Sequence, residues 1–328
     1  MNAVRRGRFA PTPSGDMHLG NAKIALLAWL QMRAAGGVYI LRIEDIDLQR
    51  SRPEKTELIL EDLRWLGLDW DEGPGAEKPF GPYVQSRRLD LYAEALERLE
   101  ADGRLYPCYC SRAELHGIGG APHGLASEGS PYSGTCRRLT PAEQAERARH
   151  KTPSLRFALD DRPEAEPLDF MDGIAGCQQF PPGSGGDFVV RRADGMYSYQ
   201  LAVTIDDALM GITDVLRGGD LLDSTPRQIQ LYRALGWKDR IPSFAHAPLL
   251  LGADGSRLAK RHGDLSIVSL RKSGIPRERV IGWLAYSSGL TDRFEPLAAT
   301  DLIAGFTLES ISEEDFVVTE ESLAILHN

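Results

Sequence analysis

Residues 8–21 of the chain read RFAPTPSGDMHLGN, and this stretch is the most informative segment of the sequence. Two prolines and a glycine fall between Pro11 and Gly15, so this part must form a shaped turn rather than a helix or a strand. The four residues from His18 to Asn21 open a run with the apolar spacing of a helix. Backbone N–H groups at a helix start favour anions, a glycine lets a phosphate approach closely, and a histidine can donate to it. The stretch therefore predicts a nucleotide-phosphate site, although His-x-Gly alone is equally compatible with a capping role.

Size and composition are those of an ordinary globular protein. The 328 residues, 42% of them hydrophobic and 26% charged, are enough for a large core and for two or three domains. No segment approaches the roughly 20 apolar residues of a membrane span, and residues 1–8 lack the apolar region of a secretory signal. We therefore expect a cytoplasmic protein without a membrane partner. The net charge of −9 does not exclude RNA, because local patches govern phosphate contact; the Arg-rich segment 137–156 is either such a patch or a solvated helix face.

Helix and strand patterns alternate along much of the chain, which indicates an α/β fold with a parallel sheet. A segment rich in Gly, Pro and Ser interrupts this pattern from 106 to 186, and we interpret it as an insertion. The pattern is expected to resume with a strand at 187–190 and a helix that has Ser224 as its N-cap. The predicted elements of the first part are helices at 21–35, 51–66 and 87–102 and a buried strand at 38–43.

A basic pentapeptide, RLAKR at 257–261, follows His18 by about 240 positions. A basic loop of this kind is usually no more than solvated charge. Behind a second run of strands and helices, however, it resembles the KMSKS loop of class I aminoacyl-tRNA synthetases, and residues 8–21 resemble their HIGH signature in the form of the glutamyl branch. The resemblance covers residues 8 to about 264 and implies a Rossmann-type nucleotide-binding domain.

The resemblance implies that ATP activates a carboxylate on this protein. Attack on the α-phosphate concentrates negative charge on phosphorus and on the departing pyrophosphate, which a mobile lysine can neutralise. Lys260 matches that lysine, and His18 would donate a hydrogen bond from the opposite side. Mg²⁺ is expected with the ATP phosphates, although no protein ligand for it is evident. The implied ATP-binding residues are His18, Gly20, Asn21, Arg257, Lys260 and Arg261.

The resemblance also implies a pocket for L-glutamate. Two arginines and one carboxylate complement glutamate, which has two carboxylates and one ammonium group. Glu44 matches the residue that holds the substrate amino group, and Arg217 matches the second carboxylate clamp. Without the family, Glu44 reads as part of a solvated loop and Arg217 as a surface arginine beside a turn. The implied glutamate-binding residues are Arg8, Phe9, Ala10, Pro11, Thr12, Glu44, Tyr199 and Arg217.

Three cysteines, Cys108, Cys110 and Cys136, supply soft ligands suited to tetrahedral zinc. Chemistry alone favours His116 or His123 as the fourth ligand, because a neutral imidazole binds zinc well. The alternative is that the three are unligated buried thiols. Cys177 has no partner at metal spacing and is expected to be structural.

A shorter family of paralogues, the glutamyl-queuosine tRNA(Asp) synthetases, resembles the chain more specifically. Their Cys-x-Cys pair is followed by Tyr-x-x-x-Cys, which Tyr132 and Cys136 match, so the resemblance implies Tyr132 as the fourth ligand of a structural zinc. Val203 stands where the full-length enzymes usually carry Asn, which removes a hydrogen-bonding group from the pocket. The chain also ends soon after Arg261, where an anticodon-binding region would not fit.

The resemblance to these paralogues implies transfer of glutamate, as an ester, to the queuosine base of tRNA(Asp). The alternatives are a truncated synthetase that charges the 3′ end of tRNA(Glu) and a non-catalytic RNA-binding relic. We expect a monomer. The predicted division is 1–105 and 187–245 for the two halves of the nucleotide-binding domain, 106–186 for the zinc-containing insertion, and 246–328 for the KMSKS-type loop and a helical stem.

Overall fold

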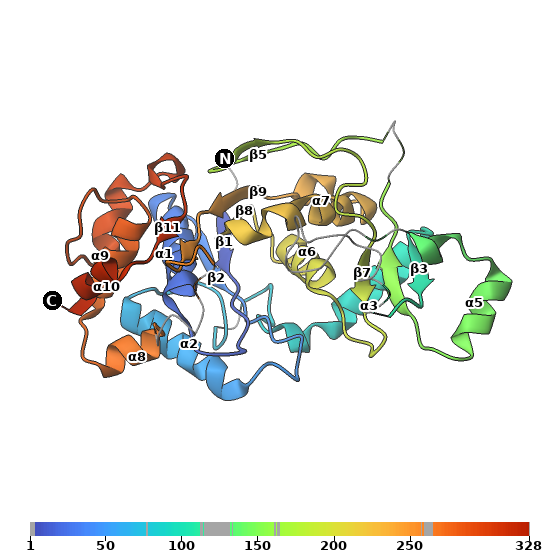
Figure 1. Cartoon of the computed structure of the whole chain (residues 1–328), viewed down its shortest axis with the longest axis horizontal. Helices are drawn as coiled ribbons and strands as arrows, with labels where there is room; N and C mark the ends of the chain where they lie inside the picture. The colour runs from blue at the N-terminus through green and yellow to red at the C-terminus, as the bar shows by residue number, and fades with distance from the viewer. Residues whose placement is uncertain are drawn as a thin grey trace.

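A largely parallel sheet forms the middle of the molecule (Figure 1). The computed structural model describes residues 4–76, 78–111, 114, 132, 134–160, 162, 165–256, 258 and 265–327. Within these residues the largest sheet has six strands in the order β2-β1-β8-β9-β5-β6, all parallel except for the pair β5 and β6. Its strands are β1 (Arg6–Phe9), β2 (Val38–Leu41), β5 (Phe170–Asp172), β6 (Gly176–Gln178), β8 (Asp214–Gly218) and β9 (Ser243–Ala247).

Helices cover both faces of this sheet, so its strands carry apolar residues on both sides. Leu216 and Ala245 pack with α1 in one cluster, whereas their neighbours Val215 and Phe244 pack in a second cluster that includes Ile229 of α7. The alternation follows from the period of two along a strand. Besides α5, the α-helices of the described residues are α1 (Leu19–Ala34), α2 (Pro53–Leu66), α3 (Leu89–Ala101), α6 (Tyr199–Leu209), α7 (Thr225–Ala234), α8 (Ile267–Lys272), α9 (Arg277–Ser287) and α10 (Glu320–His327).

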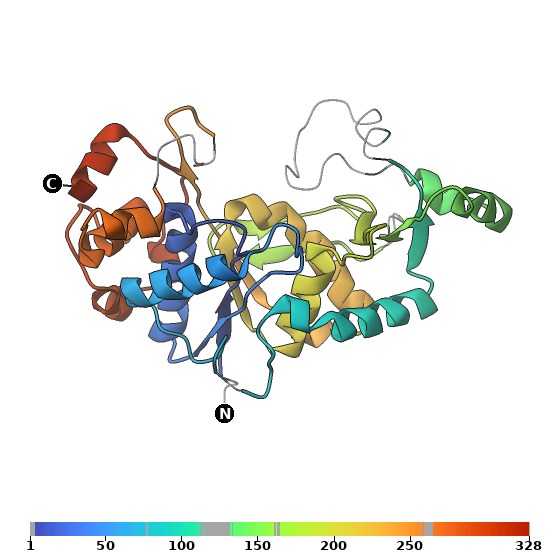
Figure 2. The same cartoon turned by 90° about the horizontal axis from the view of Figure 1, so that it is seen from below.

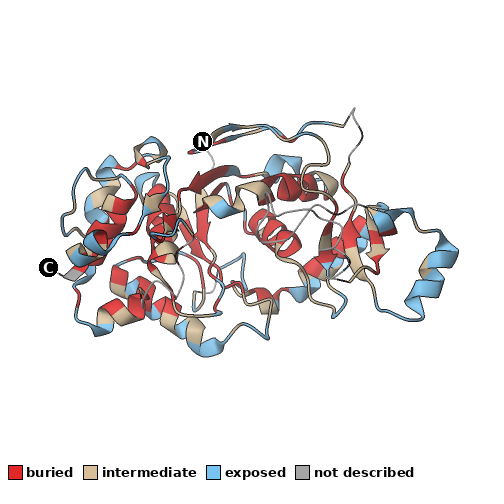
Figure 3. Cartoon of the chain, viewed as in Figure 1, coloured by how far each residue is buried: buried red, intermediate tan, exposed pale blue. Residues whose placement is uncertain are grey.

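A second sheet lies at the end of the molecule away from α9 and α10 (Figure 1). It contains β3 (Leu105–Cys108), β4 (Ser154–Phe157) and β7 (Phe188–Arg191), paired antiparallel in that order. α5 (Pro141–Ala148) projects from it and has no buried residue, as the pale blue of Figure 3 shows. Near the opposite end, β10 (Leu250–Leu251) pairs with β11 (Phe316–Val317).

Short 3-10 helices complete the described elements. They are η1 (Gln85–Arg87), η2 (Thr135–Arg138), η3 (Gly219–Ser224), η4 (Lys238–Arg240), η6 (Ala299–Gly305) and η7 (Leu308–Ser310). None of the helices in the described part of the chain has the length and apolar character needed to cross a bilayer.

The predicted α/β class with a parallel sheet and a helical C-terminal region is confirmed (Figure 2). The end of α2 at Leu66 agrees with the helix predicted at 51–66, and Gly67 caps it with φ +79°, a conformation that glycine adopts without strain. Ser224 precedes α7 as predicted, but its side chain does not cap the helix. Its hydroxyl instead accepts a hydrogen bond from Nε2 of Gln200 at 2.9 Å.

Strand pairing differs from the sequence prediction in the middle of the chain. The strand predicted at 187–190 to resume the parallel sheet is β7, which pairs antiparallel with β4 in the smaller sheet. Conversely, β5 and β6 lie within the predicted insertion but join the central sheet, where β5 runs beside β9. Apolar periodicity identifies a strand but carries no information about its partner, which is set by tertiary packing.

Candidate active site

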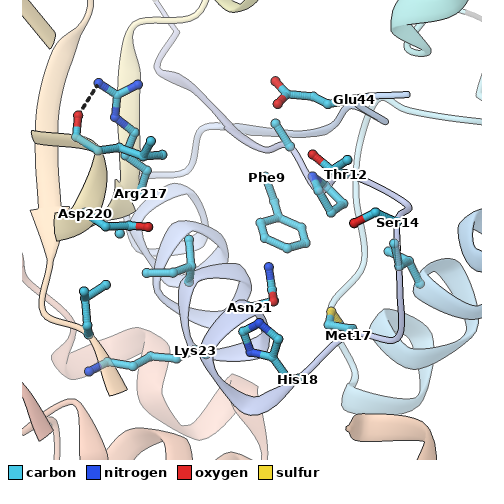
Figure 4. Close-up of a pocket in the computed structure, with 18 of the residues that line it drawn as sticks. Phe9, Thr12, Ser14, Met17, His18, Asn21, Lys23, Glu44, Arg217 and Asp220 are labelled. Carbon is cyan, nitrogen blue, oxygen red and sulfur yellow. Dashed lines mark hydrogen bonds between the residues drawn. The ribbon is translucent and has the colours of Figure 1, made fainter. Parts of the chain in front are cut away.

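A cavity of about 760 Å³ opens at the carboxyl ends of β1, β2 and β8, the edge where open α/β sheets bind ligands. It brings together all eight predicted glutamate-binding residues and the predicted ATP-binding residues His18, Gly20 and Asn21. Arg217 and Glu44 lie at one end, His18 and Asn21 at the other, with Phe9 between them (Figure 4). The cavity therefore has one end rich in charge and one end at a helix start.

The turn between β1 and α1 is fixed by backbone hydrogen bonds from neighbouring segments. The carbonyl oxygen of Pro11 accepts from the N–H of Glu44 at 3.0 Å, and that of Pro13 accepts from the N–H of Arg52 at 3.0 Å. The first of these bonds places Glu44 beside the turn although it lies 33 positions further along (44 minus 11). The two prolines stiffen a turn whose shape the adjacent chain then sets.

His18 is the N-cap residue of α1, in extended conformation, and lines the cavity. A Cβ atom at Gly20 would lie 3.1 Å from Cε1 and Nδ1 of His18. The absence of a side chain at Gly20 thus gives the imidazole ring of His18 room to lie beside the first turn of the helix. The first N–H groups of a helix are unpaired within it and favour an anion.

Arg8 belongs to a buried ionic network on one wall of the cavity. Its Nε lies 3.2 Å from both carboxylate oxygens of Asp207 on α6. Nη1 of Arg42 donates to the same carboxylate at 2.6 Å, and its Nη2 donates to Oε1 of Glu44 at 3.0 Å. Burial alone would raise the pKa of Asp207, but Arg42 and Arg8 outweigh it and hold the pKa below its usual value. Two cations here face two carboxylates.

Asp206, the neighbour of Asp207 on α6, is buried in a second set of contacts. Arg88 donates to it from Nε at 2.6 Å, Gln85 from Nε2 at 2.9 Å, and the hydroxyl of Tyr92 lies 2.9 Å from it. Sequence reasoning missed both aspartates. Two adjacent aspartates inside the otherwise apolar helix LAVTIDDAL could have indicated them. Aspartates in such a helix are rarely buried unless they are paired, so buried partners are expected.

Arg217 stands on β8 with only 4% of its surface exposed, and its partners are neutral. Nε donates to Nε2 of His246 at 3.0 Å, Nη1 to Oε1 of Gln228 at 2.9 Å and Nη2 to Oγ1 of Thr225 at 2.9 Å. Among the described residues it forms no ion pair within 4.0 Å. Burial accordingly lowers the pKa of this guanidinium. Its charge is available to an anion in the cavity.

Tyr199 begins α6 and lines the cavity, where burial raises the pKa of its hydroxyl. Val203 lies one turn further along the same helix, 1% exposed, and is not among the residues that line the cavity.

Residues 257 and 259–264 lie outside the described residues, so Arg257, Lys260 and Arg261 cannot be placed. Described residues on both sides adjoin the cavity. Leu258 lines it, and its N–H donates to the carbonyl of Leu250 at 3.0 Å. The carbonyl of Leu265 accepts from the N–H of Leu19, directly after His18, at 3.2 Å.

The three cysteines among the predicted zinc ligands meet beside β3. Their sulfur atoms lie within 4.8 Å of one another. The hydroxyl oxygen of Tyr132 is 3.6 Å from Sγ of Cys108 and 3.5 Å from Sγ of Cys110, and it accepts from the N–H of Cys136 at 2.8 Å. Three thiols and one phenol oxygen converging on one point fit a soft tetrahedral cation. The other predicted candidates, at 116 and 123, fall outside the described residues.

None of these cluster residues lines the cavity. The fourth cysteine, Cys177, is exposed on β6 of the central sheet.

Comparison with known proteins gives consistent matches. Residues 4–323 match the family model described as tRNA synthetases class I (E and Q), catalytic domain. Two relatives named Glutamyl-Q tRNA(Asp) synthetase cover nearly the whole chain. The one from Symbiobacterium thermophilum is 63% identical over 98% of both chains, and the one from Nitratidesulfovibrio vulgaris is 48% identical over 97% of both.

Longer proteins also match. A Glutamate--tRNA ligase from Sulfurihydrogenibium sp. is 42% identical over 98% of this chain and 66% of its own length. The crystal structure of a glutamate tRNA ligase from Elizabethkingia meningosepticum, in complex with its amino acid, superposes with a TM-score of 0.81 at 29% identity. That match covers 98% of this chain and 68% of the ligase.

Proposed function

The chain belongs to the class I tRNA synthetases of the glutamate and glutamine branch, and from this premise we propose that it makes glutamyl-queuosine on tRNA(Asp). In this proposal the protein first activates L-glutamate with ATP without needing tRNA. It then transfers the glutamyl group to the queuosine base. The name shared by the relatives at 63% and 48% identity supports the choice of acceptor.

One observation carries the first step: a single cavity holds Arg217, Glu44 and the helix start at His18. Glutamate carries one net negative charge. A carboxylate of the substrate would balance Arg217, which has no ion-pair partner among the described residues, and the substrate ammonium would approach Glu44. The α-carboxylate then points to the end of the cavity where the helix start favours phosphate.

The activation step joins an oxygen of the α-carboxylate to the α-phosphorus of ATP and breaks the bond to pyrophosphate. Negative charge grows on the phosphorus oxygens and the leaving group. In this proposal His18 donates to them from α1, and Lys260 neutralises their charge. Mg²⁺ arrives with the ATP phosphates. A hydroxyl of the queuosine cyclopentenediol next attacks the activated carbonyl carbon, which forms the ester and releases AMP.

Cys108, Cys110, Cys136 and Tyr132 would hold a zinc ion that stabilises the region around β3 and takes no part in the chemistry. The support is the donor set and its convergence.

Acceptor assays test the proposal. Radiolabelled glutamate should enter tRNA(Asp) that carries queuosine, including a sample that lacks the 3′-terminal adenosine. It should enter neither the unmodified transcript nor tRNA(Glu). Equal labelling of modified and unmodified tRNA(Asp), or labelling that needs the terminal adenosine, would contradict the proposed acceptor.

Glutamate-dependent ATP–pyrophosphate exchange in the absence of tRNA tests activation separately. Its absence would favour the alternative of a non-catalytic relic. Lys260→Ala should lower the exchange rate far more than it raises the KM for glutamate, because the lysine acts on charge that develops only in the transition state.

A further inference from the structure

Three side chains stand in a row across neighbouring parallel strands, and one of them, Arg217, lines the cavity. Asp172 is on β5, His246 on β9 and Arg217 on β8, exposed by 2%, 3% and 4%. His246 and Arg217 are direct partners in the register of β8 and β9. Nδ1 of His246 lies 2.6 Å from Oδ2 of Asp172, and Nε2 of His246 lies 3.0 Å from Nε of Arg217.

These contacts decide which ring nitrogen of His246 carries the proton. Oδ1 of Asp172 already accepts the N–H groups of Ile174, Ala175 and His246 at 3.0, 2.9 and 3.0 Å. Its Oδ2 faces Nδ1 and, as part of a carboxylate, can only accept. On the other side of the ring, Nε of Arg217 can only donate, and the hydroxyl of Thr225, 3.3 Å from Nε2, can donate to the same nitrogen. The arrangement is satisfied when Nδ1 carries the proton and Nε2 bears a lone pair, which is the neutral ring.

A neutral acceptor has an effect on Arg217 that a carboxylate would not have. A carboxylate at the position of Nε2 would fix the guanidinium and also cancel its charge, as Asp207 does for Arg8. The imidazole fixes the guanidinium and leaves the charge to be balanced by the ligand. Asp172 keeps its own charge one ring away.

We propose that Asp172 and His246 form a positioning pair for Arg217. Asp172 holds the ring proton of His246 at Nδ1, and Nε2 of His246 then orients the guanidinium toward the substrate carboxylate. Neither residue touches the substrate. The inference deepens the proposed function, because glutamate is the ligand whose carboxylate Arg217 receives.

The most informative variant is Asp172→Asn, because asparagine has the shape of aspartate and its Oδ1 can accept the same three backbone N–H groups. Its amide NH₂ would face Nδ1 and donate to it, so the ring proton moves to Nε2 and confronts the N–H of Arg217. In tRNA-independent exchange we expect the KM for glutamate to rise by about tenfold or more and the KM for ATP to stay within twofold. Asp239→Asn makes the same chemical change at an exposed position and should leave both constants unchanged.

A pair of histidine variants separates orientation from packing. In His246→Gln the side-chain oxygen can reach the position of Nε2 and accept from Arg217. In His246→Asn the amide reaches only the position of Nδ1. The proposal expects His246→Gln to keep the KM for glutamate within about threefold of the wild type and His246→Asn to raise it as Asp172→Asn does. Equal constants for these two variants would overturn it, as would an unchanged KM in Asp172→Asn.

A readout independent of glutamate keeps this inference apart from the proposed function. ¹⁵N NMR of histidine-labelled protein should show an unprotonated Nε2 for His246 in the wild type and a protonated Nε2 in Asp172→Asn. A protonated Nε2 in the wild type would refute the positioning pair even if glutamate is activated. If the wild type shows no exchange with glutamate, the proposed function fails while the ring protonation still decides the pair.

Discussion

Two arginines reach the same cavity, are each 4% exposed, and differ in what they bind. Arg8 faces the carboxylate of Asp207, and the cluster of Arg8, Arg42, Asp207 and Glu44 is balanced in charge. Arg217 faces a ring nitrogen, an amide oxygen and a hydroxyl. Burying an unbalanced charge is costly, so a protein that does so at a cavity wall keeps a strong site for an anion. Two arginines with the same burial can therefore serve either stability or binding, depending on whether their partners are charged or neutral.

The largest effect on glutamate activation is expected when Arg217 is replaced. Arg217→Gln should lower kcat/KM for glutamate by about a thousandfold, ~4 kcal/mol, because the substrate carboxylate loses its buried partner. The free energy of unfolding should stay within about 1 kcal/mol of the wild type, since the native protein loses an unbalanced buried charge. Exchange kinetics and urea unfolding measure the two effects. A large loss of stability would remove the distinction between the two arginines.

Arg8→Gln should act chiefly on stability. Removing one partner of a buried ion pair leaves a carboxylate partly unpaired, and we expect a loss of about 3 kcal/mol in the free energy of unfolding. Arg42 still faces Asp207 at 2.6 Å, which limits the loss. Urea unfolding of this variant beside Arg217→Gln gives the matched comparison. A loss of glutamate affinity without a loss of stability would mean that Arg8, like Arg217, serves binding rather than stability.

The stability of the protein should depend on pH in a way that tests whether His246, the hydrogen-bond acceptor of Arg217, is neutral. Burial lowers the pKa of His246 to about 4, below the ~6.5 of an unfolded histidine. Between these values the unfolded chain binds a proton that the native protein does not, so stability from this group falls as the pH drops from 6.5 toward 4.

Glutamine does not titrate, so His246→Gln does not lose stability in this way. The free energy of unfolding of the wild type minus that of the variant should therefore fall by about 2 kcal/mol between pH 7 and pH 5. Asp62, whose pKa burial raises to about 6, titrates in the same range but is common to both proteins and cancels. Urea unfolding at the two pH values measures the difference. A difference that does not change with pH would mean that His246 is not held neutral.

The cysteine cluster gives the smallest expected effect on the cavity. Cys136→Ser should lower bound zinc well below one equivalent and reduce the melting temperature, because metal binding contributes folding energy. The KM for glutamate should change by less than about twofold, since no cluster residue lines the cavity. Metal analysis and exchange kinetics on the same sample check both. A large rise in the KM for glutamate would mean that the cysteine cluster affects glutamate binding, which would contradict this prediction.

The sequence predicted much of this site and little of what distinguishes its two arginines. The turn after Arg8 and the helix start at His18 are local, so short-range pattern and family resemblance predicted them. The partners are not local: Asp207 lies 199 positions from Arg8, and Asp172 lies 74 from His246. Arg8 on β1 meets Asp207 through the packing of α6, and His246 meets Asp172 through the order of the strands. The strand that carries Asp172 fell within the predicted insertion.

The most direct test of the central claim compares glutamate with glutamine in tRNA-independent ATP–pyrophosphate exchange. Glutamine has the same shape but no side-chain carboxylate, so it would leave Arg217 buried and unbalanced. We expect the wild type to prefer glutamate by about a hundredfold or more in kcat/KM and Arg217→Gln to lose most of this preference. Equal use of the two amino acids by the wild type, or an undiminished preference in Arg217→Gln, would contradict it.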